Sequence, residues 1–377
     1  MKIVYVANLR LPTDKAYGVQ IIKMCQAFGR AGATVELLFP ERHNPISSEL
    51  FAYYGIEPNF TAQCVTAPDF YLPGRLDKLA VLAKNLLSAW RLSRRAAQQS
   101  ADWYFTRDET VAILLTWLVP TRRTTYEAHK FSRYRHWLYQ LLQRRGVRLV
   151  TISRVLQEKF LAAGWPSEQT LVAHDGVDLK QFALTLTAVE ARQALALPLE
   201  RSLAIYCGQF FLWKGAAVMA RAARLLPGTD FIMIGGRSAA VADIKKRFGA
   251  LSNLKVRGHQ PHNRIPLWLR AATVLVLPNI LTTEADSAYT SPLKLFEYMA
   301  SGRPIVASDL PSLREVLDSN NAKLVPPGDP AVLARGIGEL VANPAQAERL
   351  AEQAKRDVQQ YSWEKRAGKI LDFTVVS

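Results

Sequence analysis

One lysine and one glutamate have the surroundings that chemistry on a phosphorylated substrate would need. Lys214 follows Gly208, which ends an expected buried strand at 203–208, after a short loop. A lysine in that position can reach a diphosphate and neutralise charge that develops on a leaving group. Glu297 is the only acid in an otherwise apolar helix expected to begin near residue 291. Taken without context, either residue is more simply an ordinary charge on a helix surface.

The segment around Glu297 is expected to run as loop, helix and strand. Ser291 is a good N-cap, Pro292 suits the first helical position, and Gly302 supplies a left-handed stop. The sequence PIVAS at 304–308 is then typical of a buried parallel strand. A helix that begins directly after a strand-end loop points free backbone amides at the carboxyl edge of the sheet. Phosphate is the usual anion at such a place.

Expected strands alternate with expected helices along the chain, which predicts an α/β fold with parallel sheets. Apolar periodicity fades between about residues 178 and 202, so we place a domain boundary near residue 180. The predicted domains are 1–180 and 181–359. The expected strands are 2–7, 34–39, 203–208, 230–235, 254–258, 273–278 and 304–308.

Composition narrows the class of protein. The chain has 377 residues, of which 49% are hydrophobic, and this is enough for two globular domains. The first residues read as a strand rather than a signal peptide, and no apolar run is long enough to span a membrane. Cys25, Cys64 and Cys207 are widely spaced in apolar settings, which indicates reduced core thiols of a cytoplasmic protein. The formal charge of +16 calls for an acidic partner or surface.

The segment 289–304 resembles the donor-binding signature of the retaining family 4 glycosyltransferases. In that family a Glu, seven residues and a second Glu precede Ala-Met-Ala-x-Gly-x-Pro. Glu297 takes the place of the second Glu, whose role is to hold the ribose of the nucleotide, and the match continues through Met299, Ala300, Gly302 and Pro304. Tyr289 stands where the family has its first Glu, and a tyrosine hydroxyl can still bind a sugar.

A second family pattern, Gly-Arg-Leu followed by three residues and Lys-Gly, matches Gly208, Lys214 and Gly215. The resemblance therefore implies that Lys214 clamps the diphosphate. Gln209 replaces the arginine of the family, so one of two expected cations is missing. Arg237 and Arg257 lie near glycines of the same site and are candidates to replace it.

The resemblance also implies a fold and further site residues. The fold is GT-B, with two Rossmann-like domains whose sheets face an inter-domain cleft, and the last helix, at about 360–377, returns to the first domain. His129 stands where the family carries a catalytic histidine near the transferred sugar, although Lys130 replaces the aspartate that follows it there. The residues expected at the donor are Glu297, Gln209, Ser291, Leu293, Tyr289, Gly235, Gly258, His259 and Gly18.

The function that the resemblance implies is transfer of a hexose from a nucleoside-diphosphate sugar to a hydroxyl of a glycan or lipid-linked glycan acceptor, with retention of configuration. The family usually works without metal, and this chain has no Asp-x-Asp motif in its signature, so we expect no cofactor. A nucleotide-sugar epimerase of the same fold is the alternative. A basic nucleic-acid-binding protein is disfavoured, because the basic residues form no recognition helix or aromatic-studded sheet motif.

Much of the positive charge falls in one part of the first domain. Residues 71–150 hold 15 Lys and Arg against 5 Asp and Glu, a net of +10. On a helix expected at about 76–97, one apolar stripe is expected to be core, while Lys84, Arg91 and Arg95 share another face. A second basic and aromatic run follows at 129–145. We therefore expect docking on an anionic membrane, at the inner face of the cell membrane. The apolar stripe consists of Leu79, Leu82, Leu86 and Trp90.

Overall fold

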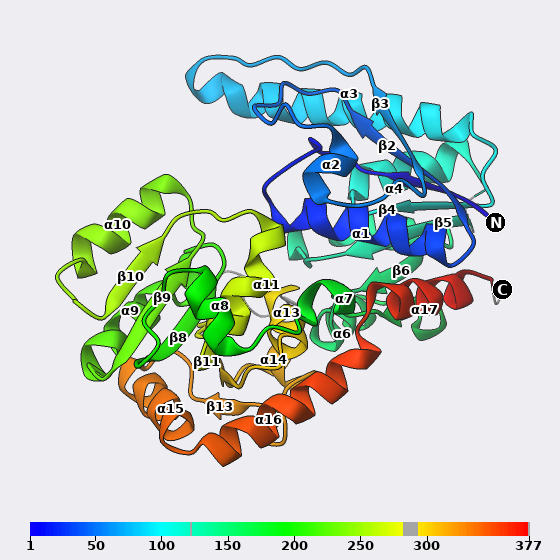
Figure 1. The fold of residues 1–377 in the computed structure, drawn as a ribbon. Coiled ribbons are helices and arrows are strands. Elements are labelled where there is room, and N and C mark those ends of the chain that lie inside the picture. The colour runs from blue at the N-terminus through cyan, green and yellow to red at the C-terminus, as the bar shows by residue number, and fades with distance from the viewer. Residues whose placement is uncertain (121–122, 282–292, 376–377) are drawn as a thin grey trace. The chain divides into compact units, whose positions relative to one another are not determined.

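The computed structural model describes residues 1–120, 123–281 and 293–375, which form two compact units (Figure 1). Unit 1 comprises Met1–His174 and Trp363–Ser377, and unit 2 comprises Asp175–Ser362. Each unit is built around one parallel sheet covered by helices. The predicted α/β class with two Rossmann-like parallel sheets is confirmed.

The sheet of unit 1, within the described residues, has the strand order β3-β2-β1-β4-β5-β6-β7, and neighbouring strands are parallel. Its strands are β1 (Lys2–Val6), β2 (Thr34–Pro40), β3 (Thr61–Val65), β4 (Trp103–Thr106), β5 (Thr124–Ala128), β6 (Arg148–Thr151) and β7 (Thr170–Val172). Its helices are α1 (Ala16–Arg30), α2 (Leu50–Tyr54), α3 (Asp77–Ala97), α4 (Glu109–Leu118), α5 (His136–Arg144), α6 (Arg154–Ala162) and α17 (Trp363–Val375).

The sheet of unit 2, within the same described residues, has the order β10-β9-β8-β11-β12-β13 and is again parallel. Its strands are β8 (Ser202–Cys207), β9 (Thr229–Ile234), β10 (Leu254–Arg257), β11 (Val274–Leu277), β12 (Ile305–Ser308) and β13 (Lys323–Val325). Its helices are α7 (Leu179–Phe182), α8 (Ala188–Ala194), α9 (Ala216–Leu225), α10 (Ser238–Phe248), α11 (Ile265–Ala271), α13 (Leu293–Ala300), α14 (Pro311–Arg314), α15 (Pro330–Ala342) and α16 (Pro344–Asp357).

The strand order reverses once in each sheet, and this decides where a ligand can bind. In unit 1 the chain winds outward from β1 through β2 to β3, then returns to β4 on the other side of β1. In unit 2 it winds from β8 to β10 and returns to β11 beside β8. At such a reversal the connections leave in opposite directions, so the carboxyl ends of the two central strands stay uncovered. The loops after β8 and β11 are therefore the natural ligand loops of unit 2.

The final helix belongs to unit 1, although it follows unit 2 in sequence. Helix α17 packs beside α1, and the two are joined by the ion pair between Arg30 and Glu364, whose nitrogen and oxygen lie 2.7 Å apart. Ala367 and Ile370 of α17 are buried. The apolar burial is the larger contribution, because the ion pair is exposed and exposed pairs contribute about 1 kcal/mol or less.

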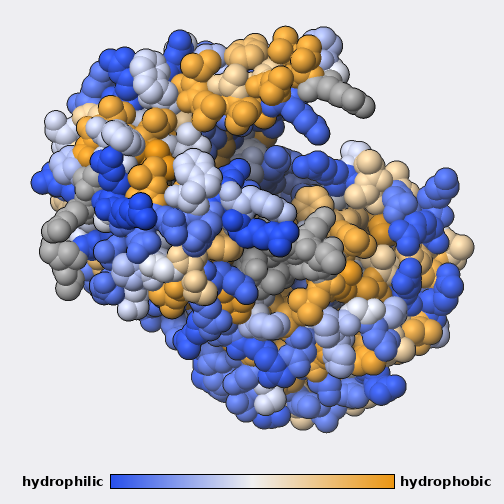
Figure 2. All heavy atoms as spheres, turned by 180° about the vertical axis from the view of Figure 1, so that it is seen from behind, coloured by the Kyte–Doolittle hydropathy of each residue, from blue (hydrophilic) through white to orange (hydrophobic). Residues whose placement is uncertain are grey.

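The prediction that the apolar stripe of α3 is core is wrong. Leu79, Leu82, Leu86 and Trp90 are between 45% and 62% exposed. Figure 2 shows apolar side chains gathered along the upper part of the molecule, where α3 lies. The face that packs inward carries mostly short side chains, which let the helix lie close to the sheet and to α4. That buried face consists of Ala80, Lys84, Ser88, Ala89, Leu92, Ser93 and Ala96.

Lys84 was expected on a solvated basic face and is instead buried. Its amine donates to Asp69 Oδ1 at 3.1 Å and lies 3.7 Å from the centre of the Tyr71 ring. Arg91 donates to the carbonyl of Thr66 at 3.2 Å, and Arg95 donates to Gln63 at 3.1 Å. The basic residues of this face therefore bond to the loop and strand beside the helix. None of the described helices combines the length and apolar character that a membrane crossing needs.

Candidate donor site and a buried polar network

Three glycines mark the carboxyl edge of the sheet in unit 2. Gly208 follows β8, Gly235 follows β9, and Gly258 follows β10. The edge is tight: a Cβ added at Gly235, whose φ is +107°, would lie 2.5 Å from the carbonyl oxygen of Gly208. Only glycine lets these two strand ends approach so closely. Glycine at Gly235 therefore sets the close packing of these two strand ends.

Lys214 lies in the loop between β8 and α9, beside the reversal of strand order. It ends a short 3₁₀ turn (Leu212–Lys214), and Gly215, at φ +71°, then starts α9 against the carbonyl of Pro278 after β11. Its amine lies 4.9 Å from the centre of the Trp213 ring and has no carboxylate partner among the described residues. Burial lowers the pKa of Lys214 to about 8. Lys214, the predicted diphosphate clamp, is thus a half-buried cation that no carboxylate of the described residues neutralises.

Lys294, on the first turn of α13, is a functional candidate that sequence reasoning missed. The residue is 7% exposed, and its amine has no hydrogen-bond partner within the part of the chain that the structure describes. It lies 4.3 Å from the centre of the Tyr206 ring, on β8. Burial first, and then the charge of Lys214, hold the pKa of Lys294 well below its usual value. The available signal was one lysine on the buried side of an apolar helix.

Glu297, the predicted ribose ligand, lies one turn further along α13 and is mostly buried. Its Oε1 lies 3.0 Å from Nε2 of His262, and Nδ1 of that ring lies 3.3 Å from Nε2 of Gln181. The carboxylate is therefore held in one orientation by a side chain from another element, the 3₁₀ turn His262–Arg264. His262 was not predicted, because nothing in its local sequence links it to Glu297.

The remaining predicted donor residues differ in how exposed they are, and two of them are not described by the structure. Leu293 begins α13 and is half-buried, while Tyr289 and Ser291 lie outside the described residues. Gln209 is half-buried, and its backbone carbonyl accepts a 2.7 Å hydrogen bond from the hydroxyl of Tyr206. His259, like Arg237 and Arg257, is exposed. Neither arginine makes a side-chain hydrogen bond or ion pair with any described residue, so neither is seen to replace the missing family arginine.

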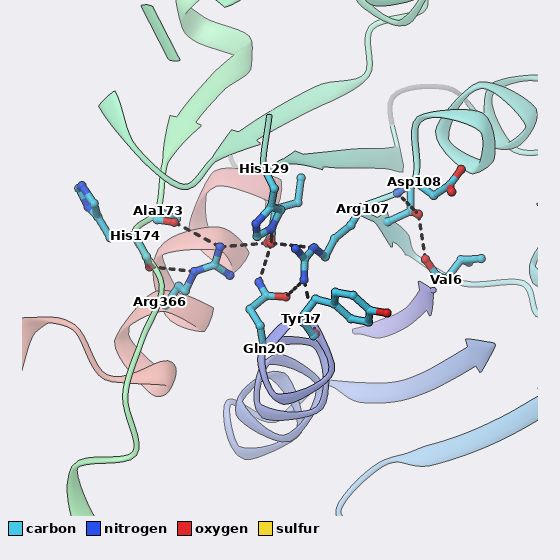
Figure 3. A network of polar contacts seen from close by, with 11 residues as sticks. Val6, Tyr17, Gln20, Arg107, Asp108, His129, Ala173, His174 and Arg366 are labelled. Carbon is cyan, nitrogen blue, oxygen red and sulfur yellow. Dashed lines mark hydrogen bonds and ion pairs between the residues drawn. The ribbon is translucent and has the colours of Figure 1, made fainter. Parts of the chain in front are cut away.

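Unit 1 contains a separate network at the carboxyl ends of β4 and β5, centred on Glu127. Figure 3 shows the partners Gln20, His129 and Arg366 pointing toward one another. This carboxylate is fully buried. Its Oε1 accepts from Gln20 Nε2 at 2.5 Å and lies 2.5 Å from His129 Nε2, while its Oε2 accepts from Arg366 at 3.0 Å. Arg107 donates to Gln20 at 2.7 Å and lies 3.8 Å from Glu127. Elements far apart in sequence are thus joined through one acid.

The charges of this network decide the protonation of His129, the predicted catalytic histidine. Burial alone would raise the pKa of Glu127, but Arg366, His129 and Arg107 outweigh it and hold that pKa below its ordinary value. Burial and Arg107 together lower the pKa of His129 to about 4, although Glu127 opposes them. The imidazole is therefore neutral at pH 7. Because an ionised carboxylate only accepts, Nε2 carries the proton and Nδ1 keeps its lone pair.

Arg366 ties the end of the chain to this network. It donates to the backbone carbonyls of His174 at 2.9 Å and Ala173 at 3.2 Å, in addition to Glu127.

Gly18, on the first turn of α1, leaves room for a neighbour: a Cβ there would lie 2.2 Å from the hydroxyl oxygen of Tyr54. The predicted ligand glycine of unit 1 thus has a packing role in the structure.

Cysteines and acids give no candidate metal centre in the described residues, where no group of three or more His, Cys, Asp or Glu could hold an ion. Cys25 and Cys207 are buried, as expected of core thiols. Cys64 is exposed, so the expectation of a core thiol is wrong there. It lies on β3, which is the edge strand of its sheet.

Comparison with known proteins gives a family for part of the chain. Residues 201–343 match the family described as glycosyl transferases group 1. The chain is 30% identical over 216 residues to D-inositol 3-phosphate glycosyltransferase of Xylanimonas cellulosilytica, which covers 53% of this chain and 50% of that protein. It is 31% identical over 221 residues to amylovoran biosynthesis glycosyltransferase AmsK of Erwinia amylovora, covering 57% and 51%. The chain thus spans about half the length of these curated relatives.

The whole chain is similar to a solved structure. HepE of Anabaena, in complex with UDP and glucose, superposes with a TM-score of 0.75 at 19% sequence identity, and 100% of each chain is covered. A likeness at this identity shows the fold, and the GT-B fold expected from the sequence is confirmed.

The depressed pKa of His129 predicts how stability changes with pH. Between pH 7 and 5 the unfolded chain takes up a proton at this histidine, near pH 6.5, while the folded protein, with a pKa of about 4, does not. The free energy of unfolding should therefore fall by about 2 kcal/mol between pH 7 and pH 5 because of this residue. Urea unfolding at pH 7 and pH 5 measures the loss. His129→Gln should reduce it by that amount, and His43→Gln, at an exposed histidine of the same unit, should not. Equal pH dependence in the wild type and His129→Gln would contradict the neutral, half-buried imidazole.

Proposed function

Because residues 201–343 belong to the glycosyl transferases group 1 family, we propose that the protein transfers a sugar from a nucleoside-diphosphate sugar to a hydroxyl group of an acceptor. The observation that carries the proposal is the positive charge at the carboxyl edge of unit 2. Lys214 lies beside the reversal of strand order without an acidic partner among the described residues, next to strand ends that only glycine permits. A diphosphate is an anion of suitable charge for such a place.

The proposed reaction breaks the bond between the anomeric carbon and the diphosphate oxygen, and the electron pair leaves with the diphosphate. The acceptor oxygen forms the new bond to the anomeric carbon and loses its proton. Lys214 would stabilise the charge that grows on the leaving oxygen, and Glu297, held by His262, would accept hydrogen bonds from the ribose hydroxyls. Following the family resemblance, we also propose that His129 contacts the transferred sugar, where its neutral ring would offer a lone pair to a hydroxyl without adding charge.

The finer description follows the family resemblance and the relatives. We propose a hexose donor, retention of configuration and an acceptor that is a cell-envelope glycan or lipid-linked glycan. Two observations support this choice: HepE was solved with UDP and glucose, and AmsK is a glycosyltransferase of amylovoran biosynthesis. The base of the donor nucleotide is chosen by a few pocket contacts, so a thermal-shift panel of UDP-, GDP- and ADP-sugars is the first experiment. A nucleotide-sugar epimerase would be indicated instead if activity on the donor needed no acceptor.

We further propose that the acceptor is met at the inner face of the cell membrane, on a surface formed by α3, α4 and α5. These helices are neighbours, and each exposes large apolar side chains. Arginines lie against the aromatic members: Arg94 over Trp90, Arg145 over Trp117 and Arg133 over Tyr134. Aromatic rings flanked by arginines suit the boundary between lipid headgroups and acyl chains. The exposed apolar residues are Leu79, Leu82, Leu86, Leu87, Trp90, Trp117, Leu118, Tyr134 and Trp137.

Lys214→Ala and Glu297→Ala should each lower kcat/KM for sugar transfer by roughly 10²–10³-fold, equivalent to about 3–4 kcal/mol of lost transition-state binding. Lys246→Ala and Glu348→Ala, at exposed positions of the same unit, are matched controls and should leave the rate unchanged. Steady-state kinetics with the donor found in the panel gives the comparison. Near-normal rates in both site variants, with the melting temperature unchanged, would refute the site.

Transfer should continue in excess EDTA. The proposed site offers lysines and backbone amides to the diphosphate rather than paired carboxylates that would suit Mg²⁺. Activity is compared with and without EDTA, then after addition of Mg²⁺ or Mn²⁺. Loss on chelation and recovery with the ion would overturn this expectation. Glu284 and Asp286, which lie outside the described residues, would then be the first ligands to test.

The protein should co-sediment with phosphatidylglycerol vesicles and bind less at high salt, because the surface is both basic and apolar. Leu79→Gln combined with Leu82→Gln should weaken binding roughly 30-fold, since each leucine contributes about 1 kcal/mol when partly buried in lipid. Leu225→Gln, at a leucine of unit 2 that is 54% exposed, is the control and should bind like the wild type. Equal binding to neutral vesicles, or none to anionic ones, would exclude this docking surface.

A further inference from the structure

Lys294 is a buried lysine in a place where a lysine is costly. It is 7% exposed, and its amine nitrogen is buried with no hydrogen-bond partner among the residues that the structure describes. The neighbouring positions of α13 are apolar, and Leu295, Phe296 and Met299 belong to the core. Burying an amine without a hydrogen bond is unfavourable whether the group is charged or neutral. Such a residue is expected to have a partner that enters with a ligand.

The Lys294 side chain lies at the end of β8, which is where a ligand that binds its amine would be placed. The Lys294 stem crosses the end of β8, because its Cδ would lie 3.7 Å from a Cβ added at Gly208. Its amine lies 4.3 Å from the ring centre of Tyr206. Gln209 directly follows Gly208, so the lysine reaches the strand end at which the family has an arginine and this chain does not. The two positions are far apart in sequence and meet only in the fold.

The charges around Lys294 favour an anion. The titratable groups that act on it are Lys214 from the loop before α9, Cys207 of β8, and Glu297 of its own helix. Burial raises the pKa of the Cys207 thiol and of the Tyr206 phenol, so both are neutral at pH 7. Glu297 is already partnered by His262. Two lysines therefore share one strand end, and the only nearby acid among the described residues is engaged elsewhere.

We propose that Lys294 is the second cation of the diphosphate site and replaces the arginine for which this chain has Gln209. The inference rests on the proposed function, since the anion is the diphosphate of the sugar donor. Lys214 would approach the diphosphate from the loop between β8 and α9, and Lys294 from the first turn of α13. Two amines on one diphosphate match its charge better than either amine alone.

The same arrangement makes donor binding depend on a proton. In the free protein, burial and the charge of Lys214 hold the pKa of Lys294 well below its usual value, which favours the neutral amine. A bound diphosphate favours the ammonium form and raises that pKa, so a proton is taken up from solvent. Net proton uptake on nucleotide binding is therefore expected, chiefly at Lys294, with a smaller share at Lys214.

Calorimetric titration with UDP, GDP and ADP, each in two buffers of different ionisation enthalpy, tests both parts of the proposal. Lys294→Met should weaken binding of the preferred nucleotide roughly ten- to hundredfold and remove most of the proton uptake. Without nucleotide, its melting temperature should equal or exceed that of the wild type, because a buried unpaired amine has been replaced by an apolar chain of similar length. A merely structural lysine would show the opposite, lower stability with unchanged affinity.

The double variant Gln209→Arg with Lys294→Met is the decisive control. It places a permanent cation at the family position, so affinity should return while proton uptake stays absent. Wild-type affinity and uptake in Lys294→Met would overturn the inference and leave the proposed function standing. If none of the three nucleotides bound to the wild-type protein, the proposed function itself would fail.

Discussion

The positive charge at the end of β8 is the constraint on which the account of this protein depends. Two lysine amines, Lys214 and Lys294, act on each other there, and within the described residues neither has a carboxylate to pair with. A folded protein tolerates this only because the wider unit is stable: the strands of the sheet are almost wholly buried between helices. The stabilisation from that apolar burial offsets the local cost, and a site that is unsatisfied without ligand is ready to bind one.

The two units share a reversal of strand order beside their first strand, but the charges at that place are compensated differently. Both reverse strand order beside their first strand, and both place polar groups at the carboxyl edge of a parallel sheet. In unit 1 the central acid Glu127 is surrounded by Arg366, Arg107 and Gln20, so its charge is compensated within the fold. In unit 2 the amines of Lys214 and Lys294 have no carboxylate partner among the described residues, and we propose that a ligand supplies the compensating charge. The neutral His129 belongs to the compensated network, and Lys214, the proposed diphosphate clamp, belongs to the other.

Sequence patterns predicted the parts of this structure that depend on neighbours along the chain. Alternating apolar strands and helices predicted the α/β class, and the spacing around Lys214 and Glu297 indicated the kind of family whose model residues 201–343 match. Sequence patterns could not predict contacts between residues that are far apart along the chain. His262 contacts Glu297 from a different turn. The sequence around Lys294 does not distinguish it from a lysine on the surface of a helix, and only the structure shows that its amine is buried.

Helix α3 shows a second limit of sequence patterns. Its amphipathic pattern predicts that the leucines face the core. The helix instead packs closely against its neighbours through the small side chains of the other face. The leucines are left on the surface, where they suggest a lipid partner that the charge alone had indicated.

The most direct test of the account is a crystal structure of the protein with its preferred nucleoside diphosphate. If both lysines bind the diphosphate, its phosphate oxygens should lie about 2.7–3.2 Å from the amines of Lys214 and Lys294, with the ribose at Glu297. A nucleotide bound elsewhere, or one whose phosphates leave both amines without a partner, would contradict it.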